Sequence, residues 1–226
     1  MDILVKYLCI IQARTSSTRL PAKIMLDLDG QILLQRCIQS VKKSKYIDKI
    51  VVATSENSED DIVEDKLKYL GVNCFRGSLD NVLERFYKCA KSYEALNIVR
   101  VTADNALVEG ELIDKLIEVY EKENMDYAVF EESIYGISSE VFSYKSCEKA
   151  FYSTEDAYDI EHVTPYIKKN FKSHFELIEE AYQGSDIRAT IDTFEDYIRM
   201  QKFYFFCKKN DLEANLDTYL KYLKEI

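Results

Sequence analysis

The hydrophobic pattern divides the chain into short apolar runs and longer segments whose apolar residues recur at helical spacing. The short runs have the length of β-strands and comprise KYLCIIQA (6–13), DKIVVATS (48–55), VNCFRG (72–77), NIVRVTAD (97–104) and MDYAVFE (125–131). Amphipathic helices are expected between them, over LLQRCIQSVKK (33–43), DIVEDKLKYLG (61–71), NVLERFYKCAKSY (81–93) and ELIDKLIEVYEK (111–122). This alternation predicts βαβ units around a mainly parallel sheet with helices on both faces.

The pattern becomes irregular in the second half of the chain. Residues 131–152 contain one strand candidate, EVFSY (140–144), and the last ~30 residues have the spacing of two helices. HVTPYIKKN (162–170) is expected to be a helix, and FELIEEAY (175–182) and IRATID (187–192) are expected to be strands. Because no low-complexity linker or internal repeat interrupts the sequence, we predict a single α/β domain over residues 1–226.

The charge balance argues against a nucleic-acid partner. The chain has 30 Lys and Arg against 40 Asp and Glu, a formal net charge of −10. Most nucleic-acid-binding proteins carry a basic surface, because neutralising phosphates supplies most of their affinity. A small phosphate ligand needs only a local basic pocket, and the segment near the N-terminus offers one.

The cysteines and the N-terminal residues indicate a cytoplasmic protein. The six cysteines are scattered without metal-ligand spacing, and several lie in apolar runs, as free buried thiols do in a reducing compartment. The longest apolar stretch near the N-terminus, residues 7–11, is too short for a signal peptide or a membrane span. We therefore expect neither a zinc site nor a membrane partner.

The first candidate for chemistry is the segment IIQARTSSTRLPAK (10–23), which contains the end of the first strand and the loop after it. Open α/β sheets bind ligands at the carboxyl ends of their strands. The segment combines the cations Arg14, Arg19 and Lys23 with small hydroxyl side chains that include Ser16, Ser17 and Thr18. Such a loop suits a polyphosphate, but a solvated basic turn explains the same residues equally well. It is neither a Walker A loop nor a GxGxxG dinucleotide motif.

Two aspartates stand at the ends of other predicted strands. Asp104 ends NIVRVTAD, and Asp192 ends IRATID. Two carboxylates at the carboxyl edge of a sheet are well placed to hold one Mg2+ ion that bridges phosphates. Each aspartate also lies shortly before a predicted helix, where it could instead cap the helix N-terminus. From the spacing alone, capping is favoured.

Other charged features carry less weight. SEDDIVED (58–65) is most simply the acidic first turn and outer face of a helix. DLDG (27–30) matches the DxD of metal-dependent glycosyltransferases, but its glycine indicates a turn before a helix. His174 lies in a polar stretch, and His162 could either contact a ligand or pack against a helix.

The segment IIQARTSSTRLPAK resembles the opening signature of cytidylyltransferases of the spore-coat polysaccharide biosynthesis type, relatives of the CMP-Kdo and CMP-sialate synthetases. Further blocks match in order: IVVATSENSEDD (50–61), FRGSLDNVLERF (75–86), NIVRVTADNALVEGELID (97–114), EVFSY (140–144), EHVTPYI (161–167) and IRATIDTFEDY (187–197). Both prolines of the chain, Pro21 and Pro165, fall inside these blocks, which together span nearly the whole chain.

The resemblance implies a Rossmann-like, mostly parallel sheet flanked by helices, as in nucleotide-diphospho-sugar transferases. It also implies transfer of CMP from CTP to a small sugar, sugar acid or other anionic acceptor, with release of pyrophosphate, in surface polysaccharide or glycan biosynthesis. Mg2+ would be the cofactor, held by Asp104 and Asp192, which reverses the preference for capping. Residues 1–130 would form the nucleotide-binding half, and residues 131–226 the acceptor-binding and dimerisation half of a homodimer.

The resemblance also assigns roles to individual residues. The catalytic residues would be Arg14, Lys23 and Asp104. The nucleotide would be bound by Ala13, Arg14, Ser16, Ser17, Thr18, Arg19, Lys23, Arg76, Gly77 and Arg100. The acceptor would be bound by Glu140, His162 and Arg188.

Departures from the family pattern leave alternatives open. The family usually has glycine at the positions of Ser16 and Ala103, where a missing Cβ lets the backbone approach a phosphate. Asn105-Ala106 also replaces a small residue followed by proline. A homologue that binds a nucleotide or a partner without turnover therefore stays open, as does the same chemistry with UTP or GTP. A glycosyltransferase that uses DLDG would leave the cations of residues 14–23 unexplained.

Overall fold

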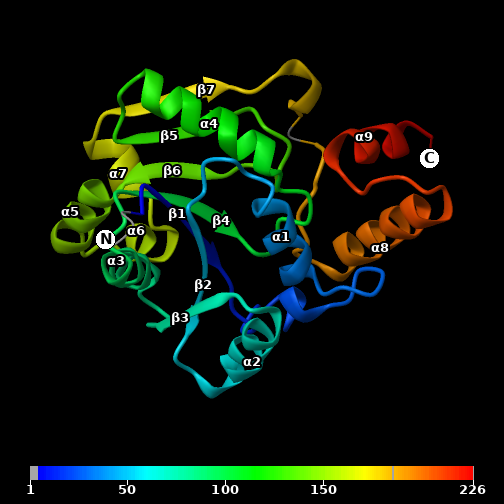
Figure 1. Cartoon of the computed structure of the whole chain (residues 1–226), viewed down its shortest axis with the longest axis horizontal. Helices are drawn as coiled ribbons and strands as arrows, with labels where there is room; N and C mark the ends of the chain where they lie inside the picture. The colour runs from blue at the N-terminus through cyan, green and yellow to red at the C-terminus, as the bar shows by residue number, and fades with distance from the viewer. Residues whose placement is uncertain (1–4, 185, 226) are drawn as a thin grey trace.

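The computed structural model describes residues 5–184 and 186–225 (Figure 1). Within these residues, one seven-stranded sheet has the order β3-β2-β1-β4-β6-β5-β7. Its strands are β1 (Tyr7–Gln12), β2 (Lys49–Ser55), β3 (Asn73–Gly77), β4 (Asn97–Thr102), β5 (Tyr127–Glu131), β6 (Glu140–Ser143) and β7 (Ser173–Leu177). Neighbouring strands are parallel except around β6, which is antiparallel to both β4 and β5. The prediction of a mostly parallel sheet is confirmed.

Helices cover both faces of this sheet. They are α1 (Leu33–Val41), α2 (Asp61–Leu70), α3 (Val82–Ser92), α4 (Gly110–Lys122), α5 (Tyr144–Ser153), α6 (Ala157–His162), α7 (Pro165–Asn170), α8 (Phe194–Lys209) and α9 (Leu216–Glu225). Successive side chains of a strand point to opposite faces. Cys9 and Ile11 of β1 therefore pack with α1, α2 and α4, whereas Leu8 and Ile10 pack with α3, α5 and α7.

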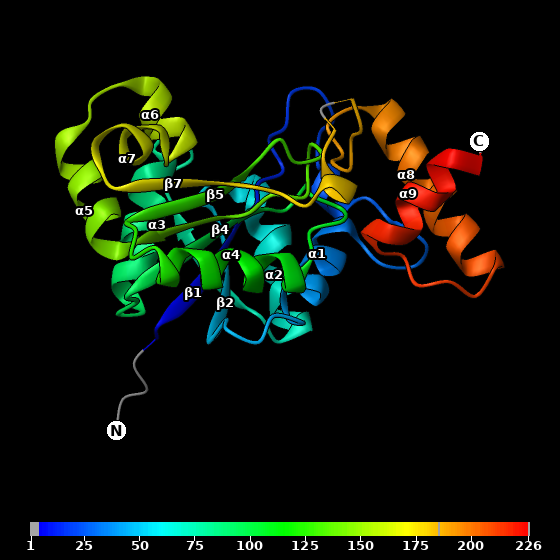
Figure 2. The ribbon, with the colours of Figure 1, turned by 90° about the horizontal axis from the view of Figure 1, so that it is seen from above.

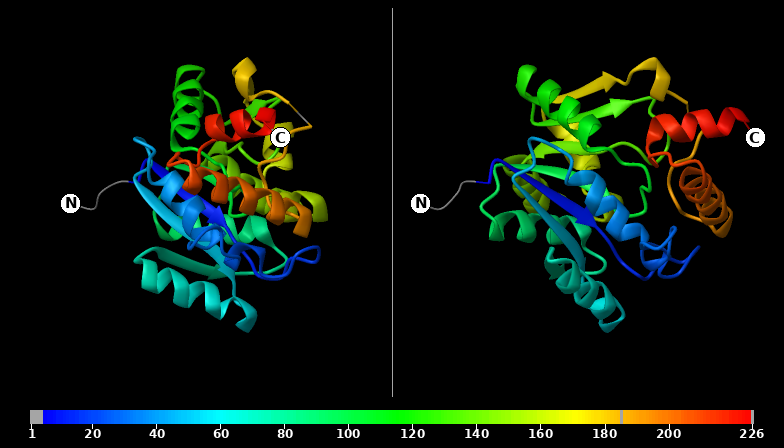
Figure 3. Two further views of the ribbon diagram at one scale, coloured as in Figure 1. Left: turned by 90° about the vertical axis from the view of Figure 1, so that its right-hand side faces the viewer. Right: turned by 45° about the vertical axis from the view of Figure 1, so that its right-hand side comes forward.

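A third apolar cluster lies at one end of the molecule. Phe203 of α8 and Tyr219 of α9 pack there with Leu107, Ile134 and Ile191 from three loops. Figure 2 shows α8 and α9 at the end opposite α5, α6 and α7, and Figure 3 shows the two helices side by side. The cluster fixes the segment before α8, which carries Asp192, against the loops that follow β4 and β5.

The first half of the chain folds as the hydrophobic pattern predicts, and the second half departs from it. The expected strand IRATID (187–192) is wrong: Arg188 and Thr190 make only isolated bridges, to Tyr135 and Asn105. Ala189 and Ile191 are buried because they pack in the third cluster, with residues of α8 and α9. FELIEEAY contributes only its first residues to β7, and α5 occupies much of the stretch expected to be irregular.

Two further expectations concern burial and the membrane. The six cysteines are free thiols, and all are buried except Cys74, which is partly buried. Among the residues that the structure describes, no helix is both long enough and apolar enough to cross a bilayer.

Candidate active site

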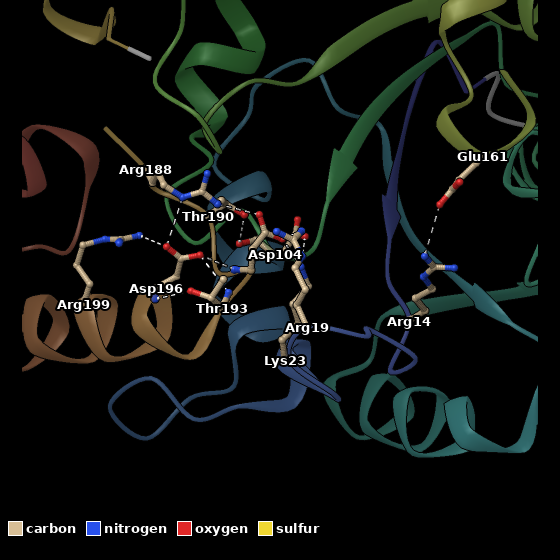
Figure 4. A network of polar contacts seen from close by, with 11 residues as sticks. Arg14, Arg19, Lys23, Asp104, Glu161, Arg188, Thr190, Thr193, Asp196 and Arg199 are labelled. Carbon is tan, nitrogen blue, oxygen red and sulfur yellow. Dashed lines mark hydrogen bonds and ion pairs between the residues drawn. The ribbon is translucent and has the colours of Figure 1, made fainter. Parts of the chain in front are cut away.

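Lys23 brings together three segments that are far apart in the sequence (Figure 4). It begins the 3-10 helix η1 (Lys23–Met25), after Ala22, whose backbone is left-handed with φ 54°. The Lys23 ammonium lies 2.5 Å from Oδ2 of Asp104, just after β4, and 2.8 Å from Oδ1 of Asp192, just before α8. One buried cation therefore pairs with both Asp104 and Asp192, the carboxylates for which the sequence allowed either metal binding or helix capping.

Neither carboxylate caps a helix. The N-cap of α4 is Glu109, and the N-cap of α8 is Thr193, whose hydroxyl forms a capping box with Asp196. The capping interpretation of Asp104 and Asp192 is therefore wrong. Both side chains are instead directed at a cation, as Figure 4 shows for Asp104.

Asp192 is the most heavily neutralised carboxylate of the site. Besides Lys23, its oxygens lie 3.1 Å from Arg19 and 3.1 Å from Arg188, and its side chain is only 6% exposed. Burial alone would lower the pKa of Lys23, but Asp104 and Asp192 outweigh it and raise that pKa. The two carboxylates thus favour the charged form of Lys23, and three cations surround Asp192.

Asp196 fixes the backbone from which Asp192 projects. Its carboxylate accepts hydrogen bonds from the backbone N–H groups of Asp192 and Thr193, and it pairs with Arg199 at 2.7 Å. Although burial raises its pKa, the bond from Arg199 and those from the backbone lower it to about 2. Sequence analysis did not single out Asp196 or Arg199; the only available signal was the Thr-x-x-Asp spacing before α8.

The loop after β1 is held in place by hydrogen bonds to Asp60, the N-cap residue of α2. Asp60 is fully buried and accepts hydrogen bonds from the backbone N–H and the hydroxyl of Thr15, and from Ser55. Sequence analysis had placed Asp60 on an acidic outer helix face, which is wrong for this residue. The Oγ atom of Ser16 is buried and has no hydrogen-bond partner among the described residues, so it is an unsatisfied polar group of this loop.

The other residues expected to bind nucleotide are distributed around this loop. Ala13 is buried, and its N–H bonds to Ala53 of β2 at 3.1 Å. Arg14 points toward Glu161, 3.9 Å away, and away from Lys23 (Figure 4). Arg76 of β3 pairs with the carboxylates of Asp61 and Glu64 in α2. Its guanidinium is therefore already held in ion pairs at the edge of the sheet.

A cavity of about 340 Å³ opens beside Asp104. Its lining includes Arg100 of β4, Glu140 of β6, Tyr135 and Thr190. Arg188 packs against one lining residue, with its guanidinium 4.7 Å from the centre of the Tyr135 ring. The structure thus brings Arg100 and Glu140 together, although the resemblance placed one on the nucleotide side and the other on the acceptor side.

Glu140 anchors the inner wall of this cavity. It pairs with Arg100, and its other oxygen accepts hydrogen bonds from Tyr127 and Thr164 and pairs with Lys168 at 2.8 Å. Burial alone would raise the pKa of Glu140, but Arg100 and Lys168 outweigh it and lower the pKa to about 2. A carboxylate held in this way stays ionised, so it orients Arg100 and does not serve as a proton acceptor.

His162 contributes little to this arrangement. It is exposed at the end of α6, and its ring lies 4.3 Å from that of Tyr158. The neighbouring Glu161 is the residue nearer to the loop after β1, through Arg14. A role of His162 at the acceptor site stays a prediction.

The family model for cytidylyltransferases matches residues 8–226. A relative from Methanocaldococcus jannaschii, described as an uncharacterised protein, is 43% identical over 205 residues, which cover 88% of this chain and 84% of the relative. The spore coat polysaccharide biosynthesis protein SpsF of Bacillus subtilis is 35% identical over 206 residues, 87% of this chain and 85% of SpsF. This chain belongs to the cytidylyltransferase family. It is therefore an enzyme of the nucleotidyltransferase class.

Solved structures agree with this assignment. A cytidylyltransferase from Leptospira borgpetersenii superposes with a TM-score of 0.82 at 31% identity, over 92% of this chain and 95% of that chain. CMP:2-keto-3-deoxy-manno-octonic acid synthetase, solved in complex with CTP, superposes with a TM-score of 0.69 at 13% identity, over 90% of this chain and 99% of that chain. The latter likeness concerns the fold alone.

Two positions where the cytidylyltransferase signature usually has glycine lie within this site. Ser16 leaves its hydroxyl buried and unsatisfied, and Ala103 is buried with its N–H bonded to Gln12 at 3.0 Å. Ala103 is thus accommodated within the sheet edge without disturbing the hydrogen bond that continues the pairing of β4 with β1. The replacement of these glycines leaves the approach of Asp104 to Lys23 intact.

Proposed function

We propose that this enzyme transfers CMP from CTP to a small anionic acceptor and releases pyrophosphate, with Mg2+ as the cofactor. The observation that carries the proposal is the position of Lys23 between Asp104 and Asp192, beside a cavity that Asp104 also lines. The arrangement joins the three parts that nucleotidyl transfer needs: cations for phosphates, carboxylates for a metal and a space for a second substrate.

Asp104 and Asp192 fit the metal because they supply oxygen ligands to one point, which Lys23 occupies here. The described residues contain no cluster of three or more His, Cys, Asp or Glu side chains that could hold an ion, so phosphate and water oxygens would complete the coordination. When bound, the ion neutralises charge at the α-phosphate. A relative of similar fold, Rv0371c of Mycobacterium tuberculosis, is known as a manganese complex.

Direct displacement at phosphorus accounts for the reaction. An acceptor oxygen attacks the α-phosphorus in line, a new P–O bond forms, and the bond to the β-phosphate breaks with its electron pair on pyrophosphate. Lys23 and Arg19 are placed to balance the charge of that leaving group, and Arg14 joins them when it turns from Glu161. A hydroxyl acceptor loses its proton to solvent or to a nearby carboxylate, and an ionised acceptor needs no base.

The cavity beside Asp104 supports an anionic acceptor. Glu140 holds Nη1 of Arg100. Within residues 5–184 and 186–225, Nη2 makes only a 3.3 Å contact with Gln12, and Nε has no partner. Nε and Nη2 lie on the same side of the guanidinium and can grip a carboxylate with two hydrogen bonds. A sugar acid therefore fits this cavity better than a neutral sugar. SpsF, a spore coat polysaccharide biosynthesis protein, supports a place in surface polysaccharide synthesis.

We also propose that residues 1–130 bind the nucleotide and that residues 131–226 bind the acceptor and form a homodimer in the cytoplasm. These proposals rest on the resemblance. A homologue without turnover is the alternative, and the observation that favours it is the presence of Ser16 where the family usually has glycine, in the loop that would meet the phosphates.

Pyrophosphate release tests the proposal. The enzyme would be incubated with Mg2+, each nucleoside triphosphate in turn, and either 2-keto-3-deoxy-manno-octonic acid, a nonulosonic acid mixture or mannose. We expect release with CTP and an acid, none with mannose, and a loss of at least about a hundredfold in Asp104→Asn. Release that needs no acceptor, or that persists in Asp104→Asn, would contradict the mechanism.

A further inference from the structure

Arg85 is a buried arginine without a counter-ion. It lies in the first turns of α3, and its side chain is fully buried. Nη1 donates a hydrogen bond to the carbonyl oxygen of Ser78 at 2.6 Å, but Nε and Nη2 have no partner within the described residues. The same part of the chain provides no ion pair for this guanidinium. Two hydrogen-bond donors of a charged group are therefore left unmatched in the interior.

Such a group is costly for the nucleotide-free protein. Burial lowers the pKa of Arg85 to about 10, and the like charge of Arg14 acts in the same direction, while Asp60 opposes both. An apolar side chain at this position would avoid the loss of hydration of a charge and of its hydrogen bonds. Buried polar groups in native proteins are nearly always matched, so an unmatched pair of donors calls for a partner that binds later.

The position of Arg85 indicates where that partner would bind. A Cβ atom at Gly77 would lie 3.1 Å from Cγ of Arg85, so the arginine packs directly behind the last residue of β3. Its Nη1 holds Ser78, the next residue along. The guanidinium thus lies beside the segment after β3, and Arg14 of the loop after β1 is near enough for its charge to lower the pKa of Arg85. In the proposed function these two segments frame the nucleotide.

The free edge of the guanidinium has a defined chemical preference. Nε–H and Nη2–H point in parallel, so they match a ligand that presents two adjacent acceptors. Cytosine does so with N3 and O2. Uracil presents an N3–H donor next to O2, which would face another donor. Guanine offers O6 and N7, but only on the larger purine ring system. A cytosine base therefore satisfies both donors, and uracil leaves at least one unmatched.

We propose that Arg85 is the residue that selects cytosine, by donating two hydrogen bonds to N3 and O2 of the base. The inference rests on the proposed function, since it concerns the base of the nucleotide substrate. Because the guanidinium is covered in the nucleotide-free chain, the base must part the loop after β1 from the segment after β3 as it enters. Gly77 then leaves room for Arg85 at the back of the base.

Calorimetric binding of CTP, UTP and tripolyphosphate to the wild type and to Arg85→Met tests this inference. Bonds to a charged donor predict that wild-type enzyme prefers CTP to UTP by about tenfold to a hundredfold and that Arg85→Met loses this preference. Binding of tripolyphosphate, which has no base, should stay within about twofold. Equal losses for all three ligands would overturn the inference, because they would mean a phosphate-binding or purely structural role. An unchanged ratio of CTP to UTP affinity would overturn it as well.

A measurement on the wild type avoids the risk that Arg85→Met folds poorly. The triphosphate of 3-deazacytidine keeps O2 and the amino group of cytosine but lacks the N3 acceptor. It should bind at least about tenfold more weakly than CTP, and equal affinity would contradict the proposal. Pyrophosphate release by the wild type separates the two hypotheses. Turnover of CTP together with equal affinities for CTP and UTP removes the role of Arg85 and leaves the proposed function standing.

Discussion

Replacing Lys23 by methionine tests the electrostatic account of the site, because Lys23 is the only described cation that pairs with both Asp104 and Asp192. The substitution keeps most of the apolar volume but leaves Asp104 and Asp192 facing each other where a cation stood 2.5 and 2.8 Å away. Removing one partner of a buried ion pair costs about 3–5 kcal/mol. Arg19 and Arg188 remain beside Asp192 at 3.1 Å, so we expect a loss of about 2–4 kcal/mol.

Thermal melting measures this loss, which corresponds to a fall in Tm of roughly 5–15 °C for a chain of this size. Mg2+ should restore part of it in the variant, up to about 2.7 kcal/mol at a hundred times the dissociation constant, because the ion can take the place that the ammonium leaves. The wild type, in which Lys23 holds that place, should gain much less from Mg2+ alone.

The matched control is Lys43→Met. Lys43 also pairs with a carboxylate at 2.5 Å, that of Glu213, but both side chains are more than 60% exposed. An exposed pair contributes at most about 1 kcal/mol. If Lys23→Met and Lys43→Met melted alike, or if Mg2+ stabilised the wild type as much as Lys23→Met, the reasoning would be refuted.

The remaining predictions concern two carboxylates of the site and a pair of glycines. Asp104→Asn should lower turnover at least about a hundredfold with little change in Tm, because Lys23 keeps its bond to Asp192; steady-state kinetics and melting check this together. Glu140 has its pKa lowered from the ordinary 4.5 to about 2, so its contribution of about 3 kcal/mol is present above pH 4.5 and lost as the pH falls toward 2. Denaturant unfolding from pH 6 to 3 should show a shallower decline in Glu140→Gln. Gly136→Ala should cost about 2 kcal/mol or more, since its Cβ would lie 2.5 Å from the backbone nitrogen of Thr190, and Gly184→Ala, with 3.7 Å to its nearest atom, should cost less.

The sequence predicts the first half of the fold because hydrophobic spacing there reports directly on burial. Buried strands such as β1 and β4 are apolar along most of their length, and the helices between them have one apolar face. The segment 187–192 also has apolar residues, as these strands do. Its buried residues, however, pack against α8 and α9 and are not buried by pairing in the sheet. Spacing records that a residue is buried and does not record what buries it.

For the site, too, the sequence predicts some features and misses others. The cations of residues 14–23 and Asp104 can be found in the sequence because each follows a strand that the structure contains, whereas Asp192 was found at the end of an expected strand that does not form. That Lys23 joins Asp104 to Asp192, and that Asp60 holds the loop, depends on contacts between distant segments. Arg85 gives no signal at all, because an arginine off the apolar face of a helix is expected to be exposed, whereas here it is fully buried.

The most direct test of the central claim is the melting of the purified enzyme with Mg2+ and each of the four nucleoside triphosphates. We predict a clear rise in Tm with CTP, a smaller rise with UTP, and loss of the CTP effect without Mg2+ or in Asp104→Asn. A larger rise with another nucleotide than with CTP would keep the reaction class and correct the base. The absence of a rise with any of the four would contradict the account and favour a homologue that no longer binds nucleotide.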